Sequence, residues 1–273
     1  MSASVVRSDA GISPLFRLPP EIRRIIYAFA LPFATIAPER KIANTDGNRE
    51  IDWAALQNNG QIRYRRGHDV VWTRGCTALL AVSKQIHEET AAILYGDNTF
   101  TIDIKFDAIK FHLRWRTAQD LTPSRTYLFL EHFSQRNLLR IRHYVVNVEP
   151  VDEYMGMIKY NYGGQGLVAG VRTQMSQLAR LMAGVEALQA VNINVWHSAC
   201  GIITVFNRTP SESRTAIRKE KEEAQARTIL APLACVRGVR TVEMTGLSDQ
   251  HMEELRTMMT APKSEPASND GKN

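Results

Sequence analysis

The first part of the chain repeats apolar residues at the spacing of one helix face. These residues are Ile22, Ile25, Ile26 and Phe29. Their i, i+3, i+4, i+7 pattern predicts an amphipathic helix, and Pro19-Pro20 suits its first turn, where a missing N–H is tolerated. Leu31-Pro32 predicts its end, because the residue before a proline disfavours helical conformation.

A second amphipathic helix is expected over residues 77–95. Its apolar stripe is Leu79, Val82, Ile86, Ile93 and Leu94. Residues 99–104 alternate apolar and polar positions and predict a strand. Between the two helices, the glycines and scattered charges of residues 33–74 indicate a long irregular insertion, with a short hairpin closed by Asn59-Gly60. Residues 106–118 and 125–139 are expected to be helical.

Three segments in the second half share one spacing, apolar-x-x-apolar-x-x-apolar-x-apolar. They are Leu138, Ile141, Tyr144, Val146; Val185, Leu188, Val191, Ile193; and Val236, Val239, Val242, Met244. Threefold spacing followed by alternation is typical of a helix end that turns into a strand. The rhythm is similar to that of a leucine-rich repeat, whose period is only ~20–29 residues.

Helices are expected between these strands, over residues 169–183, from a capping box at residues 209–212, and from Ser248 onward. Strand–helix alternation implies parallel strands with right-handed crossovers. We therefore predict an α/β fold, in which a helical N-terminal unit packs on a small, mainly parallel, leucine-rich-repeat-like sheet with helices on one side. The sheet is expected to join residues 99–104, 141–148, 188–195 and 239–244.

The composition is that of a globular chain, with 273 residues, 44% hydrophobic content and a net charge of +6. Charges of both signs are mixed, and the one basic cluster, at residues 63–66, is interpreted as a solvated loop, so nucleic acid is not expected as a partner. No stretch approaches the roughly 20 apolar residues that span a bilayer, so a membrane is not expected either. Three distant cysteines, at positions 76, 200 and 235, and no export signal favour a reducing compartment, the cytosol or nucleus.

The motifs that resemble catalytic signatures are incomplete. His87-Glu88-Glu89 begins like a zinc-protease helix, but Ala91 stands where the second histidine would be required. The glycine cluster at residues 163–166 lacks a preceding strand and a following lysine, which indicates a flexible loop. Glu88 and Glu89 point about 100° apart on a helix and do not form an acid/base pair. We expect no enzyme activity, no cofactor and no metal.

Two segments together resemble a known family. Leu18-Pro19-Pro20-Glu21-Ile22-Arg23, continuing to Ile26-Tyr27, is similar to the opening of fungal F-box-like domains. Gln85-Ile86-His87-Glu88-Glu89, continuing to Leu94-Tyr95 and Asn98-Thr99-Phe100, is similar to the second signature of that family. The resemblance covers residues 15–104, and the insertion of residues 33–74 divides it.

The resemblance implies a helical unit that docks a small Skp-type adaptor of a cullin ubiquitin ligase, with a C-terminal region that captures substrates. The matching partner-binding positions are Leu18, Pro19, Ile22, Ile25 and Ile26. The alternative is that these positions only pack. In that case Leu18, Ile22, Ile25 and Phe29 would lie against Leu79, Ile86 and Ile93, although one helix can serve both purposes with two faces.

The organisation expected is a disordered N-terminus (1–14), the F-box-like unit (15–104), a repeat-like region (105–260) and a disordered tail (261–273). The first functional hypothesis is a non-enzymatic interaction module that serves as a substrate adaptor. The second is an F-box-derived scaffold with no ligase link. The third is an enzyme whose site lies near residues 154–166 and the strand ends, since open parallel sheets bind ligands there.

Overall fold

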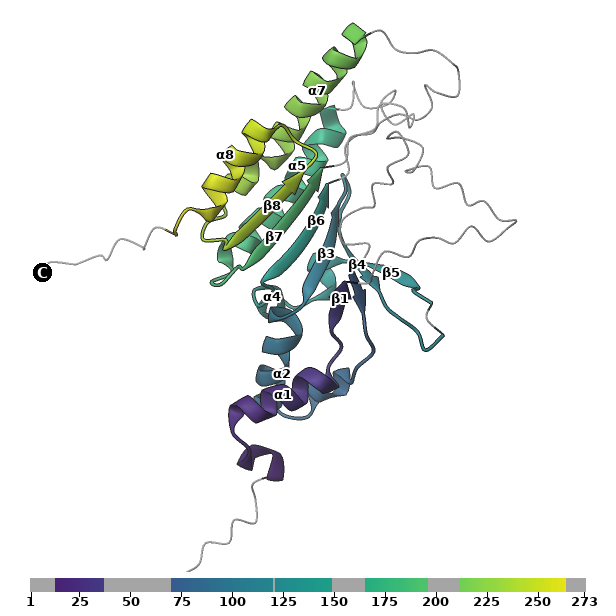
Figure 1. Cartoon of the computed structure of the whole chain (residues 1–273), viewed down its shortest axis with the longest axis vertical. Coiled ribbons are helices and arrows are strands. Elements are labelled where there is room, and N and C mark those ends of the chain that lie inside the picture. Colours follow the sequence, from purple (N-terminus) through teal and green to yellow (C-terminus); the bar gives the residue numbers. More distant parts are fainter. Residues whose placement is uncertain (1–12, 37–69, 120, 149–164, 196–211, 264–273) are drawn as a thin grey trace, which may run out of the picture.

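The computed structural model describes residues 13–36, 70–119, 121–148, 165–195 and 212–263 (Figure 1). Its first elements are η1 (Pro14–Arg17), α1 (Pro20–Ala30), β1 (Ala34–Ile36), β2 (Val70–Trp72), η3 (Thr77–Ala81), α2 (Lys84–Gly96), β3 (Thr99–Ile104), β4 (Ile109–Arg114) and β5 (Ser124–Leu128). The chain continues with α3 (Phe129–His132), α4 (Gln135–Leu138), β6 (His143–Val148), α5 (Gln165–Gly184), β7 (Ala190–Val195), α7 (Glu212–Leu230), η6 (Ala231–Cys235), β8 (Thr241–Thr245) and α8 (Asp249–Thr260).

A six-stranded sheet in the order β5-β4-β3-β6-β7-β8 forms the centre of the molecule. The four segments predicted to share a sheet do so as β3, β6, β7 and β8, and they are parallel to one another. The prediction of a mainly parallel, leucine-rich-repeat-like sheet is wrong in one respect. Because β4 and β5 add two antiparallel pairings, the sheet is mixed, and the described residues show no leucine-rich repeat.

The helix predicted over residues 106–118 is wrong, since this segment contains β4. Ile109, Phe111 and Leu113 alternate with polar neighbours, which is the period of a strand, and β3 offers an edge for them to pair with. Residues 125–139 are helical only after β5 ends. There Ser134 caps the short helix α4 by accepting a hydrogen bond from the Asn137 amide (3.4 Å).

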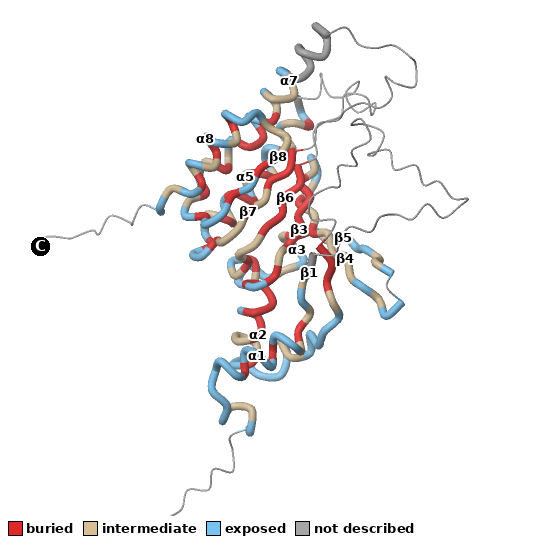
Figure 2. The backbone as a smooth tube through the Cα atoms, viewed as in Figure 1, coloured by how far each residue is buried: buried red, intermediate tan, exposed pale blue. Residues whose placement is uncertain are grey.

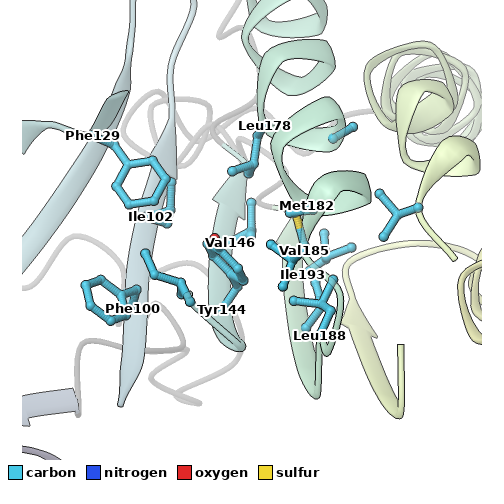
Figure 3. Close-up of a cluster of buried hydrophobic side chains, with 14 of the residues drawn as sticks. Phe100, Ile102, Phe129, Tyr144, Val146, Leu178, Met182, Val185, Leu188 and Ile193 are labelled. Atoms are coloured by element: carbon cyan, nitrogen blue, oxygen red, sulfur yellow. The ribbon is translucent and has the colours of Figure 1, made fainter. Parts of the chain in front are cut away.

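The three repeated segments align in the structure as they do in the sequence. All twelve of their apolar residues are buried. Tyr144 lies beside Val191 and Val191 beside Val242, while Val146, Ile193 and Met244 form the next level. Figure 3 shows several of these side chains meeting Leu178 and Met182 of α5. The repeat therefore encodes three equivalent helix-end-to-strand turns whose side chains share one core.

Helices α5, α7 and α8 lie on one side of the sheet, as right-handed crossovers between parallel strands require (Figure 1). The predicted helix over residues 169–183 extends in the structure over Gln165–Gly184. Val171, Met175, Leu178 and Met182 recur every three or four residues along it and are all buried. Figure 2 shows buried residues along the strands and on α5.

The opposite face of the parallel strands carries a line of polar side chains. Asn147 Nδ2 donates to Asp103 Oδ1 (2.9 Å), and Asn194 Nδ2 donates to Asn147 Oδ1 (2.9 Å). Thr245 Oγ1 completes the line by donating to Asn194 Oδ1 (2.9 Å). The four residues are neighbours across the four parallel strands. A slip of one strand by one residue would break these buried hydrogen bonds, so the line stabilises the register.

Strands β1 and β2 pair antiparallel and lie inside the two ends of the insertion predicted over residues 33–74, so these ends are regular rather than irregular. The expected hairpin at Asn59-Gly60 lies outside the described residues. Trp72 at the end of β2 packs edge-on against Phe100 (ring centroids 5.4 Å apart) and Phe111 (6.4 Å). The N-terminal unit thus shares its core with the sheet, and one hydrophobic cluster extends from Tyr27 to Met259.

Candidate protein-interaction site

The second amphipathic helix is shorter than predicted. Residues 77–81 form a separate 3-10 turn, and α2 begins after Ser83, whose hydroxyl accepts a hydrogen bond from the Ile86 amide (3.2 Å). His87 follows, with its Nδ1 2.8 Å from the carbonyl oxygen of Leu80, so the 3-10 turn is tied to the helix. This part of α2 therefore has a defined start, and the next two residues project from it in fixed directions.

Glu88 and Glu89 are adjacent on α2, but each contacts a different element. Glu88 forms ion pairs with Arg140 and with Arg136 (2.9 Å) at α4. Glu89 points to the other side and pairs with Arg23 of α1. The cause is the helical rotation of about 100° per residue. The two carboxylates thus connect α2 to elements on both of its sides.

The contact between Arg23 and Glu89 joins the two signature segments. Arg23 Nε donates to Glu89 Oε2 (3.0 Å) and Nη2 donates to Oε1 (2.6 Å), which is a bidentate pair. Arg23 Nη1 also donates to the Leu18 carbonyl (2.8 Å) and holds the chain that leads into α1. The hydrogen bond from Arg23 holds the pKa of Glu89 below its usual value. We call this pair the clamp.

Two further contacts hold α1 and the strand that follows it. Arg24 Nη2 donates to Asp97 Oδ2 (2.8 Å) at the exposed end of α2. Asn98 Oδ1 accepts from the Ala34 amide (2.6 Å), and Asn98 Nδ2 donates to the Leu94 carbonyl (2.8 Å). Asn98 belongs to the second signature, so its structural role is to attach β1 to the end of α2.

The clamp determines which side of α1 faces α2 and the rest of the fold. Arg23 and Tyr27 are buried on α1, whereas the apolar residues predicted to bind a partner are exposed. The exposed fractions are 43% for Ile22, 54% for Ile25, 41% for Ile26 and 86% for Phe29. We call these four residues the stripe. The packing alternative placed Ile22, Ile25 and Phe29 against α2, but these three side chains are exposed whereas Ile86 and Ile93 are buried.

The remaining predicted partner-binding residues lie at the start of α1. Pro19 is the N-cap residue of α1, and Leu18 before it is 36% exposed. Sequence reasoning assigned Phe29 to packing, although its spacing of seven residues from Ile22 places it on the same face. Phe33 and Val82 are also exposed, and both were missed as surface residues. More apolar side chains are therefore exposed in this region than the sequence predicted.

The described residues near the strand ends contain no assembled metal site, because no group of three or more His, Cys, Asp or Glu side chains there could hold an ion. Most of the predicted binding loop, residues 154–166, lies outside the description, apart from Gln165 and Gly166 at the start of α5. Cys76 and Cys235 are free and exposed. Among the helices that the structure describes, none is long and apolar enough to cross a membrane.

These observations define an α/β protein with a mixed sheet and an apolar, solvent-facing N-terminal helix. Residues 8–143 match the family model of a domain of unknown function (DUF7730). The chain therefore contains a DUF7730 domain, which includes both signatures, the clamp and the stripe, and which carries no F-box assignment. No curated protein and no solved structure matches the chain.

Proposed function

We propose that the chain is a non-enzymatic protein-interaction module that binds a partner protein through the stripe on α1. The observation that carries this proposal is the exposure of Ile22, Ile25, Ile26 and Phe29 on a single helix face. Contiguous apolar surface on a folded protein is typical of a protein–protein contact. Anchors at i, i+3, i+4 and i+7 are the pattern by which a helix enters a partner's hydrophobic groove.

The clamp supports the proposal because it holds the stripe rigid before a partner arrives. Arg23 is bound by two hydrogen bonds to Glu89 and one to Leu18, so α1 cannot easily rotate its apolar side inward. A preorganised surface loses less conformational entropy on association than one that orders only on binding. The buried charge and the exposed apolar residues thus belong to one arrangement.

The partner that we propose is a Skp-type adaptor of a cullin ubiquitin ligase. This follows from the resemblance of the segment Leu18–Tyr27 to the opening of fungal F-box-like domains. In this proposal Leu18, Pro19 and the stripe contact the adaptor. The repeat-like region that follows takes the role of presenting a substrate, and the protein acts in the cytosol or nucleus.

A binding measurement with purified proteins tests the proposal. The full chain is titrated with a Skp-type adaptor, alongside the variant Ile22→Asp/Ile26→Asp. We expect wild-type binding and a loss of at least about tenfold in the variant, since two charges would have to be desolvated in an apolar contact. The matched control is Leu121→Asp, another exposed apolar residue but on the β4–β5 hairpin, and it should bind as wild type does.

Two outcomes would contradict the ligase-adaptor proposal. One is the absence of binding by the wild-type protein at tens of micromolar adaptor. A stable docking contact has a dissociation constant below this concentration and would be detected. The other is a double variant that remains folded and binds with unchanged affinity.

A scaffold with no ligase link is the second candidate. It is favoured by the DUF7730 match, which covers the same segments without an F-box assignment. The same titration separates the two, because a scaffold keeps the exposed stripe but does not bind the adaptor.

A further inference from the structure

A pocket of about 230 Å³ lies between α1 and α2, away from the stripe. The residues that line it from α1 are Pro20, Arg24 and Tyr27. At about 100° per residue these three project from a different side of the helix than Ile22 and Ile25. The pocket is therefore a second feature of the N-terminal unit, and it does not depend on the proposed function of the stripe.

The charges around the pocket leave one cation in excess. Glu89 is paired with Arg23, and Asp97 is paired with Arg24 at 2.8 Å. Arg142 also lines the pocket, and in the described part of the chain its guanidinium has no hydrogen-bond or ion-pair partner. Two cations, Arg24 and Arg142, and two carboxylates, Glu89 and Asp97, line the pocket. Because Arg23 beside the pocket also pairs with Glu89, Arg142 is the lining cation left without an acidic partner.

Arg142 lies next to the end of α2. Its side chain lies against Gly96, where an added Cβ would be 3.7 Å from Arg142 Nε. Gly96 is the last residue of α2, and a cation is stabilised at a helix C-terminus by the peptide dipoles. Arg142 lines the pocket from this position, next to the negative end of the α2 dipole.

Tyr27 is a second polar residue at the pocket. It is 1% exposed, and its hydroxyl makes no hydrogen bond of good geometry in the described residues, although it lies close enough to Glu89 and Arg23 to interact with both. Burial and the neighbouring Glu89 carboxylate raise the pKa of Tyr27, so it stays a neutral donor. A buried hydroxyl without a well-formed hydrogen bond is unfavourable, and an acceptor on a ligand that reaches Tyr27 would complete that bond.

We propose that this pocket binds a carboxylate on a short aliphatic stem, the chemistry of a glutamate side chain or of a small organic acid. Arg142 would donate to the carboxylate and Tyr27 would add a neutral hydrogen bond. Pro20, Ala92 and Ile93 supply apolar wall for the stem. One surplus positive charge matches a monoanion, whereas a phosphate dianion would be repelled by the nearby Glu89 and Asp97.

An NMR titration of the full chain with four probes tests the proposal. The probes are butyrate, N-acetylglutamate methylamide, the neutral N-acetylglutamine methylamide and inorganic phosphate. We expect saturable shifts of the Ala92 and Gly96 amides with a carboxylate probe, at an affinity of about millimolar, as suits so small a ligand. The neutral amide and phosphate should bind more weakly.

Three variants assign the contacts. Arg142→Gln should weaken carboxylate binding at least about tenfold, because it removes the charged donors. Tyr27→Phe keeps the ring and should weaken binding by a smaller factor. The matched control is Arg180→Gln on the exposed side of α5, which should have no effect. Ile25→Asp in the stripe should also leave carboxylate binding unchanged, which separates this proposal from the adaptor proposal.

The probes also identify the source of the ligand. Equal binding of butyrate and the glutamate derivative supports a free organic acid, and preference for the derivative supports a glutamate side chain of a partner. Three results would overturn the proposal: no saturable shift with either carboxylate, unchanged binding in a folded Arg142→Gln variant, or tighter binding of phosphate.

Discussion

Helices α1 and α5 are both amphipathic, but they place their apolar sides in opposite surroundings. In α5, Leu178 and Met182 are completely buried against the strands. In α1, Ile25 and Phe29 face solvent, and the buried side chains are Arg23 and Tyr27. The difference is that α5 packs on a sheet, whereas α1 is attached to α2 through a charged clamp.

The comparison teaches that an apolar stripe defines which residues share a face but not where that face points. For α5 the sheet offers extensive apolar surface, so burial of the stripe is favoured. For α1 the polar side meets Glu89 and Asp97 of the neighbouring helix, and the ion pairs orient the helix. An amphipathic helix with its charged side inward is consistent with an apolar side that is reserved for another molecule.

The largest effect is expected from truncating the buried side of α5. Leu178→Ala should lower the free energy of unfolding by about 2–5 kcal/mol, because it removes a fully buried side chain and leaves a cavity. Ile25→Ala removes a side chain of similar size from α1 and should change the free energy of unfolding by no more than about 0.5 kcal/mol. Urea unfolding measures both. Similar losses in the two variants would mean that the stripe is buried in solution and would break the comparison.

A smaller but clear effect is expected from breaking the clamp. Arg23→Met removes three hydrogen bonds and leaves the Glu89 carboxylate without its arginine, so it should destabilise the chain several-fold more than Arg24→Met. Arg24 is the matched control, because its pair with Asp97 is exposed and contributes about 0–1 kcal/mol. Equal melting temperatures for the two variants would show that the clamp does not orient α1.

The clamp should also make the free energy of unfolding depend on pH in the acidic range. Because Arg23 lowers the pKa of Glu89 in the folded chain, the stabilising contribution is complete above the unfolded value of about 4.5 and is lost as the pH falls through the lower folded value. Unfolding of wild type and Glu89→Gln between pH 6 and 3 tests this. The difference in the free energy of unfolding between wild type and Glu89→Gln should decrease as the pH is lowered. A difference that does not change with pH would contradict the stabilising role of the clamp. Packing of α5 involves apolar side chains and adds no such dependence.

The smallest effect on stability is expected from polar substitution within the stripe. Ile22→Ser/Ile26→Ser should leave the free energy of unfolding within about 0.5 kcal/mol per substitution, since both side chains are exposed. The same variant should bind less of a hydrophobic dye such as anilinonaphthalene sulfonate, because it removes exposed apolar surface. A stable variant with unchanged dye binding would place the dye-binding surface elsewhere on the molecule.

Sequence periodicity predicted the parallel part of the fold well. The spacing shared by Ile141, Leu188 and Val239 located β6, β7 and β8, because each strand follows a helix end and buries the face that carries the alternating apolar residues. At β4 the pattern was misinterpreted, because Ile109, Phe111 and Leu113 alternate at the period of a strand although a helix was predicted, and the antiparallel pairing with β3 is not visible in the sequence. Local pattern alone does not report the presence of a free edge.

The candidate site was predicted in part. Ile22, Ile25 and Ile26 were identified as partner-binding residues from the F-box resemblance, and this assignment remains a prediction. The clamp and the pocket were not foreseen, because Arg23 and Glu89 are 66 residues apart and Arg142 lies still further along the chain. No periodicity connects residues at such separations.

The sequence by itself determined the amphipathic stripe of α1, the repeated strand spacing and the absence of the local catalytic motifs sought. Only the tertiary structure decided that the stripe faces outward, that Glu88 and Glu89 connect separate elements, and that Arg142 and Tyr27 meet at one pocket. The physical reason is that periodicity depends on backbone geometry within a segment, whereas orientation depends on the relative free energies of contacts with distant segments. In this chain the ion pair between Arg23 and Glu89 is such a contact.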